Sequence, residues 1–248
     1  MLFPNATPHP TVNGFVADSW DDANDLDRLT LVGDQISVSG NKAIAFNDFS
    51  QAADLLQPEY QPLGINGKGV IEKVDSPSLE RLSSLNLIAP STPNFFLQFA
   101  WRYTGTLTGT NGYLFSIVFN ASGTVQYLLT INTVTKQIFS RPWRQFTGTV
   151  GGVTSSLVLN QDQPYIIEIM YDQANSLHSL TIDGVFQGSS STMLPNVIDR
   201  FEMITNHWTT LTAPQSQRGT LFGNRAVPSY LRIKNNRRYL ANRYNISI

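Results

Sequence analysis

The sequence predicts an all-β fold, namely an antiparallel jelly-roll β-sandwich with a short C-terminal helix. Short apolar runs recur at a spacing of roughly 8–12 residues with turn formers between them, which is typical of sandwiches and barrels. Apolar and polar residues alternate through residues 165–172, which indicates a strand with one face turned inward. Residues 230–244 change to helical spacing and predict the C-terminal helix.

Length and composition fit one large domain. The chain has 248 residues, and all-β sandwiches of about 200–250 residues commonly form a single unit. Residues 1–15 are expected to form an extended N-terminal arm, and residues 16–248 a single β-sandwich domain. The net charge is −1 and only 14% of residues are charged, against about 25% in average soluble domains. This balance disfavours a nucleic-acid binder, which would carry a basic excess.

The absence of cysteine excludes disulfides and thiolate chemistry. The first ten residues lack the basic and apolar parts of a signal peptide, and no apolar run is long enough to span a membrane, so membrane insertion is not expected. The stability of the fold is therefore expected to come from packing alone.

The N-terminal third is expected to contain loops and short elements. Asp18 or Ser19 is placed to cap a short helix, with aspartates in its first turn. The acidic run at 18–27 superficially resembles a calcium loop but lacks the glycine and the bidentate glutamate of an EF-hand, so no cofactor is predicted and calcium stays a minor alternative. Residues 36–45 are predicted as a strand pair or loop, residues 47–53 as a loop or short turn, and residues 77–84 as a short helix.

The later elements follow from local composition. The strand at 94–103 carries five large apolar side chains on one face and should lie at the centre of a sheet. Residues 113–119 and 125–131 predict a hairpin, and Pro142 assigns residues 136–146 to an edge strand or a loop. A short strand at 157–159 precedes a three-stranded meander at 165–188, which turns tightly at Asp183 and Gly184. Strands at 200–205 and 220–222 lead to the helix, which ends at Asn245, a residue that tolerates the left-handed cap conformation.

Five segments, in order, resemble laminin-G-like domains of the concanavalin A-like lectin/glucanase superfamily, in their microbial and bacteriophage form. The resembling segments are Trp20 to Asp25 (W-D-D-A-N-D), residues 57–62 (Q-P-E-Y-Q-P), residues 66–70 (N-G-K-G-V), the hairpin at 165–184 (Y-x-I-x-I-x-Y-D and L-x-I-D-G) and residues 239–246 (Y-L-A-N-R-Y-N-I). The resemblance extends over nearly the whole chain. It implies a jelly-roll sandwich in which Trp20 is a core anchor.

Catalytic carboxylates are not expected. The glucanases of the superfamily carry a strand motif close to E-x-D-x-x-E, which this sequence lacks. Glu168 and Asp172 are the nearest pair, but four strand residues span about 13 Å, whereas paired glycosidase carboxylates lie about 5–9.5 Å apart. The two side chains are interpreted as a polar, outward-facing row. Among the histidines, His178 shares a strand face with Leu180 and Ile182 and is interpreted as a satisfied interior or rim residue.

A binding site for sugars would need an aromatic platform flanked by planar polar groups, because apolar sugar faces stack on rings while amides and guanidinium groups bind hydroxyls. The candidate glycan-binding residues are Tyr60, Arg141, Trp143, Arg144, Asn206, His207 and Trp208. The alternative for each tryptophan is packing over a sheet edge. In the basic C-terminal helix, Arg237, Arg238 and Arg243 are candidate contacts for an anionic partner, the alternative being bonds to acidic groups of the same domain.

These observations predict a non-enzymatic structural or binding protein. The expected role is a virion component of a bacteriophage, such as a head decoration, fibre or tail protein, with other virion proteins or a second copy of itself, and host glycans, as partners. A soluble carbohydrate-binding lectin is the first alternative, and an atypical glycan hydrolase or lyase is the second. The expected location is the virion, or otherwise the bacterial cytoplasm or the exterior reached by a non-classical route.

Overall fold

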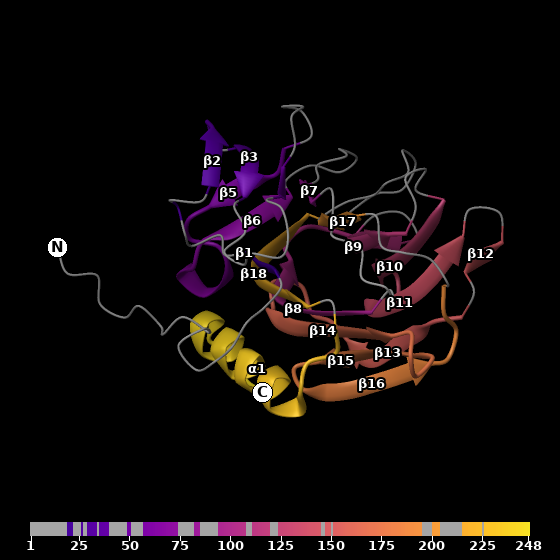
Figure 1. The fold of residues 1–248 in the computed structure, drawn as a ribbon. Helices are drawn as coiled ribbons and strands as arrows, with labels where there is room; N and C mark the ends of the chain where they lie inside the picture. Colours follow the sequence, from indigo (N-terminus) through magenta and orange to yellow (C-terminus); the bar gives the residue numbers. More distant parts are fainter. Residues whose placement is uncertain are drawn as a thin grey trace.

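The computed structural model describes residues 19–21, 26, 29–33, 35–39, 49–50, 57–73, 82–84, 94–107, 111–119, 124–144, 147–149, 151–194, 200–203, 215–224 and 226–248. Figure 1 shows two layers of strands with one helix, α1 (Tyr230–Tyr244), on the outside. All strand pairs among these residues are antiparallel. The predicted jelly-roll sandwich with a short terminal helix is confirmed. No helix in the described ranges is long and apolar enough to cross a membrane.

The first layer is built around β8 (Phe95–Tyr103), which pairs with β14 on one side and β18 on the other. Across the layer, the strands are β1 (Ser19–Asp21) and β6 (Val70–Lys73) side by side, then β18 (Ser216–Asn224), β8, β14 (Tyr165–Asp172), β15 (Leu177–Ile182) and β16 (Val185–Ser190). The predicted central strand and the predicted three-stranded meander are therefore confirmed.

The second layer contains the predicted hairpin of β9 and β10. In order, its strands are β7 (Leu82–Ser84), β17 (Arg200–Met203), β9 (Asn111–Val118), β10 (Val125–Asn132), β11 (Gln137–Arg144), and then β12 (Gly148–Thr149) and β13 (Val153–Val158) side by side. Along one side, strand pairing continues between the layers through β5 (Glu59–Gln61), β3 (Gln35–Ser39) and β4 (Phe49–Ser50), while β2 (Leu29–Val32) pairs with β3.

The core lies between the layers and is rich in aromatic rings. Both strand faces predicted to point inward are buried there: Phe95, Leu97, Phe99, Trp101 and Tyr103 of β8, and Tyr165, Ile167, Ile169 and Tyr171 of β14. Phe95 stacks on Tyr171 at 4.9 Å between ring centroids and meets Tyr127 of the other layer edge-on at 5.3 Å. Such ring pairs add to the stabilisation from burial alone, so they join the two layers firmly.

A second apolar cluster forms on the outer face of the first layer, under α1. The helix buries Leu240, Ala241 and Tyr244 against Ala100 of β8, Ile166 of β14 and Phe222 of β18. It ends at Asn245, which adopts the predicted left-handed cap conformation with φ 49°. Figure 1 shows α1 lying along this face, close to the C-terminus of the chain. One outer face of the sandwich is thus covered by the chain itself.

The predicted turn at Asp183 and Gly184 is confirmed by its backbone angles, and a second turn, at Asn66 and Gly67, also has positive φ. Asp183 and Gly184, between β15 and β16, both have positive φ, 50° and 82°, as a primed hairpin turn requires. Asn66 and Gly67, in the short 3-10 turn η4 (Ile65–Gly67), have φ of 48° and 75°. Glycine and asparagine tolerate these angles best, which explains their positions in the sequence.

The helices expected near the N-terminal third are wrong where the structure describes them. Ser19, proposed as a helix cap, begins β1, which pairs with β18 so that Trp20 lies opposite Phe222. The end of the helix expected at 77–84 is strand β7, paired with β17; residues 77–81 lie outside the described ranges. In both places pairing with a distant strand outweighs a local capping signal, because capping contributes only about 0.5–2 kcal/mol. Phe49 and Ser50, expected in a loop, form the two-residue strand β4.

Other strand predictions need changed boundaries. The strand expected at 157–159 is β13, which begins at Val153 and ends before Leu159. The strand expected at 220–222 extends over nine residues as β18 and pairs on both sides. The strand at 200–205 is confirmed over Arg200–Met203. The arm predicted at residues 1–15 lies outside the described residues.

The expectation that Pro142 confines its segment to an edge or a loop is also wrong. Residues 137–144 form β11, which pairs with β10 along its length and with β13 and β12 on its other side. Pro142 lies between the part paired with β13, which ends at Ser140, and the part paired with β12, which begins at Trp143. A proline is tolerated here because pairing on that side is interrupted where the missing N–H would matter.

Candidate functional site

Strand β11 divides its side chains between the two faces of the second layer. Ile138, Ser140 and Pro142 are buried, whereas Phe139, Arg141 and Trp143 are half-buried. Ile138 belongs to the core, so the alternate residues, which include Arg141 and Trp143, face away from it. This parity brings two of the predicted sugar-binding residues onto one outer face.

The neighbouring strand β10 supplies polar groups to the same face. Its register sets Gln126 opposite Trp143 and Thr130 opposite Phe139, and both β10 side chains are fully buried. The Arg141 guanidinium lies over the Phe139 ring, 4.8 Å from the ring centroid, a cation–π arrangement that holds the arginine along the sheet. We call Gln126, Thr130, Phe139, Arg141 and Trp143 the outer row.

The outer row combines the groups that bind sugars. Trp143 offers a half-buried ring and Arg141 offers several N–H donors, whereas the Gln126 amide and the Thr130 hydroxyl are fully buried and are not open to a ligand. Ser116 of β9, opposite Leu128 of β10, is a further fully buried polar residue on this face. These groups stand on paired strands instead of loops, which fixes their spacing before a ligand arrives.

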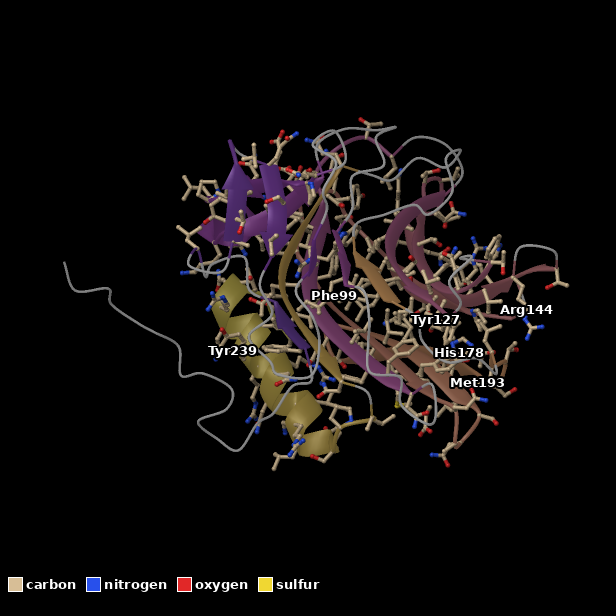
Figure 2. All side chains as sticks on the ribbon, turned by 45° about the horizontal axis from the view of Figure 1, so that its top comes forward. Phe99, Tyr127, Arg144, His178, Met193 and Tyr239 are labelled. Atoms are coloured by element: carbon tan, nitrogen blue, oxygen red, sulfur yellow. The ribbon has the colours of Figure 1, made fainter. Side chains whose placement is uncertain are left out.

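Arg144 points the other way from Trp143 and is separated from the outer row. It is half-buried, and among the described residues no atom accepts a hydrogen bond from its Nε. Its charge acts on Tyr171 in the core: burial raises the pKa of Tyr171 to about 12, and Arg144 opposes that rise. Figure 2 shows Arg144 at the same end of the sandwich as His178 and Met193. The structure therefore does not unite all three residues of the Arg141–Arg144 segment in one site.

His178 lies in the interior, as expected, but only one of its two ring nitrogens has a hydrogen-bond partner among the described residues. Its Nδ1 is 3.2 Å from the Tyr127 hydroxyl, which also bonds Ser140, and its ring stacks near Tyr171 at 6.3 Å. Among the described residues its Nε2 has no hydrogen-bond partner. The ring is fully buried, and burial lowers the pKa of His178 from 6.5 to about 4. At neutral pH it is an uncharged part of the core.

The other predicted sugar-binding residues are not brought to the outer row. Tyr60 lies in β5, half-buried, opposite Ile71 of β6, and packs against the core. Strand β5 belongs to the link between the layers, far from β11 in Figure 1. Asn206, His207 and Trp208 lie outside the described residues, so their part in a site stays a prediction.

The three arginines proposed for an anionic partner have different surroundings on α1. Arg237 forms a two-bond ion pair with Glu168 of β14, Nε to Oε1 at 2.5 Å and Nη2 to Oε2 at 2.7 Å. Arg243 donates to the Tyr239 hydroxyl at 2.9 Å and stacks on that ring. Arg238 is exposed. Of the three, Arg238 has a surface position suited to a partner.

Glu168, the carboxylate that comes closest to a catalytic candidate, is engaged in contacts within the fold. Glu168 faces away from the core, as interpreted, but α1 covers it, so that it is only 3% exposed. Besides Arg237, it accepts a hydrogen bond from Gln98 Nε2 at 2.8 Å, and Gln98 also donates to the Ile233 carbonyl of α1. The polar row that was expected to face solvent is thus a buried connection between helix and sheet. Among the described residues, no group of three or more histidine, aspartate or glutamate side chains is arranged to hold a metal ion.

Sequence reasoning missed the buried members of the outer row. The signal was present in β10, where Gln126, Leu128 and Thr130 alternate with the core residues Tyr127, Leu129 and Ile131. Two polar residues, Gln126 and Thr130, on a strand of buried residues indicate that its second face is also covered and is partly polar. The pairing of Gln126 with Trp143 depends on register and needed the structure.

The sequence matches no protein-family model and no curated protein. Solved structures share the fold. The binding domain of botulinum neurotoxin serotype D has a TM-score of 0.59 at 9% identity, over 90% of this chain and 50% of that chain. The binding domain of serotype G has a TM-score of 0.53 at 11% identity, over 93% and 51%.

A sialidase of Trypanosoma rangeli, solved in complex with sialic acid, has a TM-score of 0.54 at 12% identity, over 91% of this chain and 33% of that chain. The chain therefore spans about half the length of the two neurotoxin domains and a third of the sialidase chain. At these identities the likeness shows the fold alone, a jelly-roll β-sandwich.

Proposed function

We propose that the chain is a non-catalytic binding domain that recognises glycans through the outer row of β10 and β11. The observation that carries this proposal is the alternation along β11, which sets the half-buried Trp143 ring and the half-buried Arg141 guanidinium on the same outer face. A sugar ring stacked on Trp143 would place its hydroxyls near the Arg141 guanidinium group. The lectin-like fold supports a binding role in general, and the outer row supplies the specific site.

The surroundings of Glu168 support an action without catalysis. A general acid or nucleophile must reach the scissile bond, whereas this carboxylate is buried under α1 and held by Arg237 and Gln98. Its nearest acidic neighbour on the same strand, Asp172, is engaged in the next turn with Asn175. These two residues serve the structure, which leaves binding as the activity we propose.

The test is a glycan-array screen followed by calorimetric titration of the best ligand with the wild-type chain and with Trp143→Ala. We expect the variant to lose at least about tenfold in affinity, because an aromatic platform supplies much of the contact energy with a sugar ring. The matched control is Phe186→Ala, which removes another exposed aromatic ring, 62% exposed, from β16 of the first layer. This control should bind like the wild type.

Two outcomes would contradict the proposal. One is glycan affinity that is unchanged in Trp143→Ala, which would place the site elsewhere. The other is the release of reducing sugar ends from any bound polysaccharide at a rate that is lost in a carboxylate variant, which would show an enzyme.

The finer proposal is that this domain is a laminin-G-like surface component of a bacteriophage virion. It is supported by the sequence segments that resemble that family, the low content of charge and the lack of cysteine. Immunogold electron microscopy of purified particles is the measurement for this role, because the label would show whether the chain lies on the particle surface.

A further inference from the structure

The outer face of the first layer is not fully covered by α1, and its last strand projects an aromatic ring there. Strand register places Glu168 of β14, Thr181 of β15 and Phe186 of β16 in one row across this face. Since Arg237 of α1 binds Glu168, Phe186 lies two strand spacings, roughly 10 Å, from that contact on the same face as the helix. Figure 1 shows β16 as the outermost strand of the layer. The turn before β16 touches α1, because a Cβ added to Gly184 would lie only 2.9 Å from Arg237 Nη1.

The side of α1 nearest to β16 carries two further apolar side chains and two cations. Tyr230 and Lys234 precede Arg237 by seven and three residues, so they share its helix face. Leu231 and Arg238 form the neighbouring stripe, which is turned further towards solvent. We call the following five residues the edge patch: Phe186, Tyr230, Leu231, Lys234 and Arg238.

The three apolar side chains of the edge patch stand well out from the surface. The exposed fraction is 62% for Phe186, 73% for Tyr230 and 65% for Leu231. Exposed apolar side chains that are grouped in this way mark sites where a protein meets another protein or a membrane. A protein partner would need a matching pocket for each protruding side chain, whereas the fluid boundary of a bilayer accepts them without a matching shape. The exposure therefore favours a membrane surface.

The charge of the edge patch selects the kind of membrane. Arg238 is exposed, Lys234 is half-buried, and α1 contains five basic residues and no acidic one. The acidic side chains beside the patch are engaged in the fold: Glu168 is buried in its ion pair with the helix, and an Asp183 oxygen accepts a hydrogen bond from the Ile166 N–H. Cations beside protruding apolar side chains complement anionic lipid, because the cations attract the headgroups while the apolar groups enter the acyl boundary.

The helix that carries most of the edge patch is fixed to the sheet on its other side. Besides the Arg237–Glu168 pair, the Tyr244 hydroxyl accepts a hydrogen bond from the Thr220 backbone N–H at 2.7 Å. Asn66 Nδ2 donates to the Tyr244 carbonyl at 2.6 Å, which fixes the C-terminal end of the helix. A surface fixed in this way loses little conformational freedom when it binds, so a few side chains suffice for measurable affinity.

We propose that the edge patch attaches the chain peripherally to an anionic phospholipid bilayer. Phe186 and Leu231 enter the boundary between headgroups and acyl chains, and the Tyr230 ring lies at the level of the headgroups. Lys234 and Arg238 bind the lipid phosphates and carboxylates. This inference does not depend on the glycan site, which lies on the other layer of the sandwich.

The test is co-sedimentation of the full chain with vesicles of phosphatidylcholine that contain about 30% phosphatidylserine, beside vesicles of phosphatidylcholine alone, in about 100 mM NaCl. We expect a partition coefficient at least about tenfold higher for the anionic vesicles, and a severalfold lower value in about 500 mM NaCl. The double variant K234Q/R238Q should lower the coefficient at least about tenfold, because each cation loses its attraction to the charged surface. The matched control is Lys136→Gln, a half-buried cation between β10 and β11 of the second layer, which should change it less than about twofold.

Two further variants separate apolar contact from charge. Phe186→Ala and Leu231→Ser should each lower binding to anionic vesicles at least about fivefold at both salt concentrations, because the burial of an apolar side chain is not screened by salt. Their matched control is Val134→Ser, which removes an 80% exposed apolar side chain beside Lys136 and should bind like the wild type. Phe186→Ala should also keep the glycan affinity of the wild type, so failure of this proposal is distinguished from failure of the glycan proposal.

Four outcomes would overturn the proposal. The first two are a wild-type chain that does not bind anionic vesicles and one that binds neutral vesicles equally well. The third is vesicle binding that is unchanged in K234Q/R238Q and in Leu231→Ser. The fourth is binding of polyglutamate, weakened in K234Q/R238Q, without binding of vesicles, which would make an acidic protein the occupant. Thermal unfolding of each variant verifies that the fold is retained.

Discussion

Among single residues, His178 and Asp183 give the sandwich two opposite responses to pH. The pKa of His178 is lowered to about 4 by burial, so its neutral form is favoured in the folded state. The pKa of Asp183 is raised to about 6, chiefly by burial, so its protonated form is favoured there. The stability linked to His178 is therefore present above its unfolded pKa of 6.5 and is lost as pH falls towards 4. The stability linked to Asp183 is present at low pH and is lost as pH rises through 6.

In the variant His178→Phe, the unfolding free energy should fall less steeply as the pH is lowered. The phenyl ring is of similar size but has no titrating group and no unpartnered Nε2. The Tyr127 hydroxyl keeps its hydrogen bond with Ser140. In the wild type we expect this histidine to cost about 3 kcal/mol of unfolding free energy between pH 6.5 and 4. Urea unfolding at several pH values measures the loss, and an equally large loss in the variant would contradict the assignment.

The variant Asp183→Asn should stabilise the chain at neutral pH. Asparagine keeps an oxygen to accept the hydrogen bond from the Ile166 N–H, made at 2.6 Å in the wild type, and it tolerates the positive φ of this turn. Removing the partly buried charge should add about 1 kcal/mol at pH 7, allowing for solvent screening, and nothing well below the folded pKa. Unfolding midpoints at pH 7 and pH 4 check this. A variant that is less stable than the wild type at pH 7 would contradict a carboxylate whose charged form is disfavoured by burial.

Among the elements, α1 is joined to the first layer by the Arg237–Glu168 ion pair in addition to its apolar cluster. Arg237→Gln would leave Glu168 buried without a compensating charge, which should cost about 3–5 kcal/mol of unfolding free energy. The double variant R237M/E168Q should recover much of the loss, because it removes both charges at once. Chemical denaturation measures all of these values.

The matched control for this pair is the neighbouring arginine on the same helix. Arg238→Gln removes an exposed cation from α1 and should change the unfolding free energy by less than about 0.5 kcal/mol. If Arg237→Gln were as mild as Arg238→Gln, the ion pair would not be what fixes the helix. Hydrogen exchange of the α1 amides would show whether the helix or the whole sandwich opens first.

Elements with a strong local pattern could be predicted from the sequence, and elements that depend on distant pairing could not. Strand β8, the meander and α1 carry their own period and turn signals, so the structure has them where the sequence indicates. Strand β7 exists because β17 pairs with it, and β1 because β18 does. Those partners lie more than a hundred residues away, and nothing in the local sequence of β1 or β7 identifies them.

For the candidate site, the types of residue could be predicted from the sequence, but which of them lie together could not. The aromatic and basic character of Arg141 and Trp143 is visible in the sequence. Their separation from Arg144 depends on the parity of β11, which the proline signal misassigned to an edge or loop. The burial of Glu168 depends on where α1 lies across the sheet, a property of the tertiary fold.

Across the whole molecule, the two outer faces have different roles. The outer face of the first layer is covered by α1 and contributes stability through its apolar cluster and ion pair. The outer face of the second layer carries the outer row, which we propose as the glycan site. The rigid aromatic core between the layers fixes the spacing of both faces, as a binding domain requires.

The location of a bound glycan tests this account most directly. Nuclear magnetic resonance of the isotope-labelled chain, titrated with the tightest array ligand, would report which residues shift on binding. The account predicts that the indole N–H of Trp143 and the amides of β10 and β11 move with the titration, while those of α1 stay still. Shifts that are confined to α1 or to β5, with Trp143 unaffected, would contradict it.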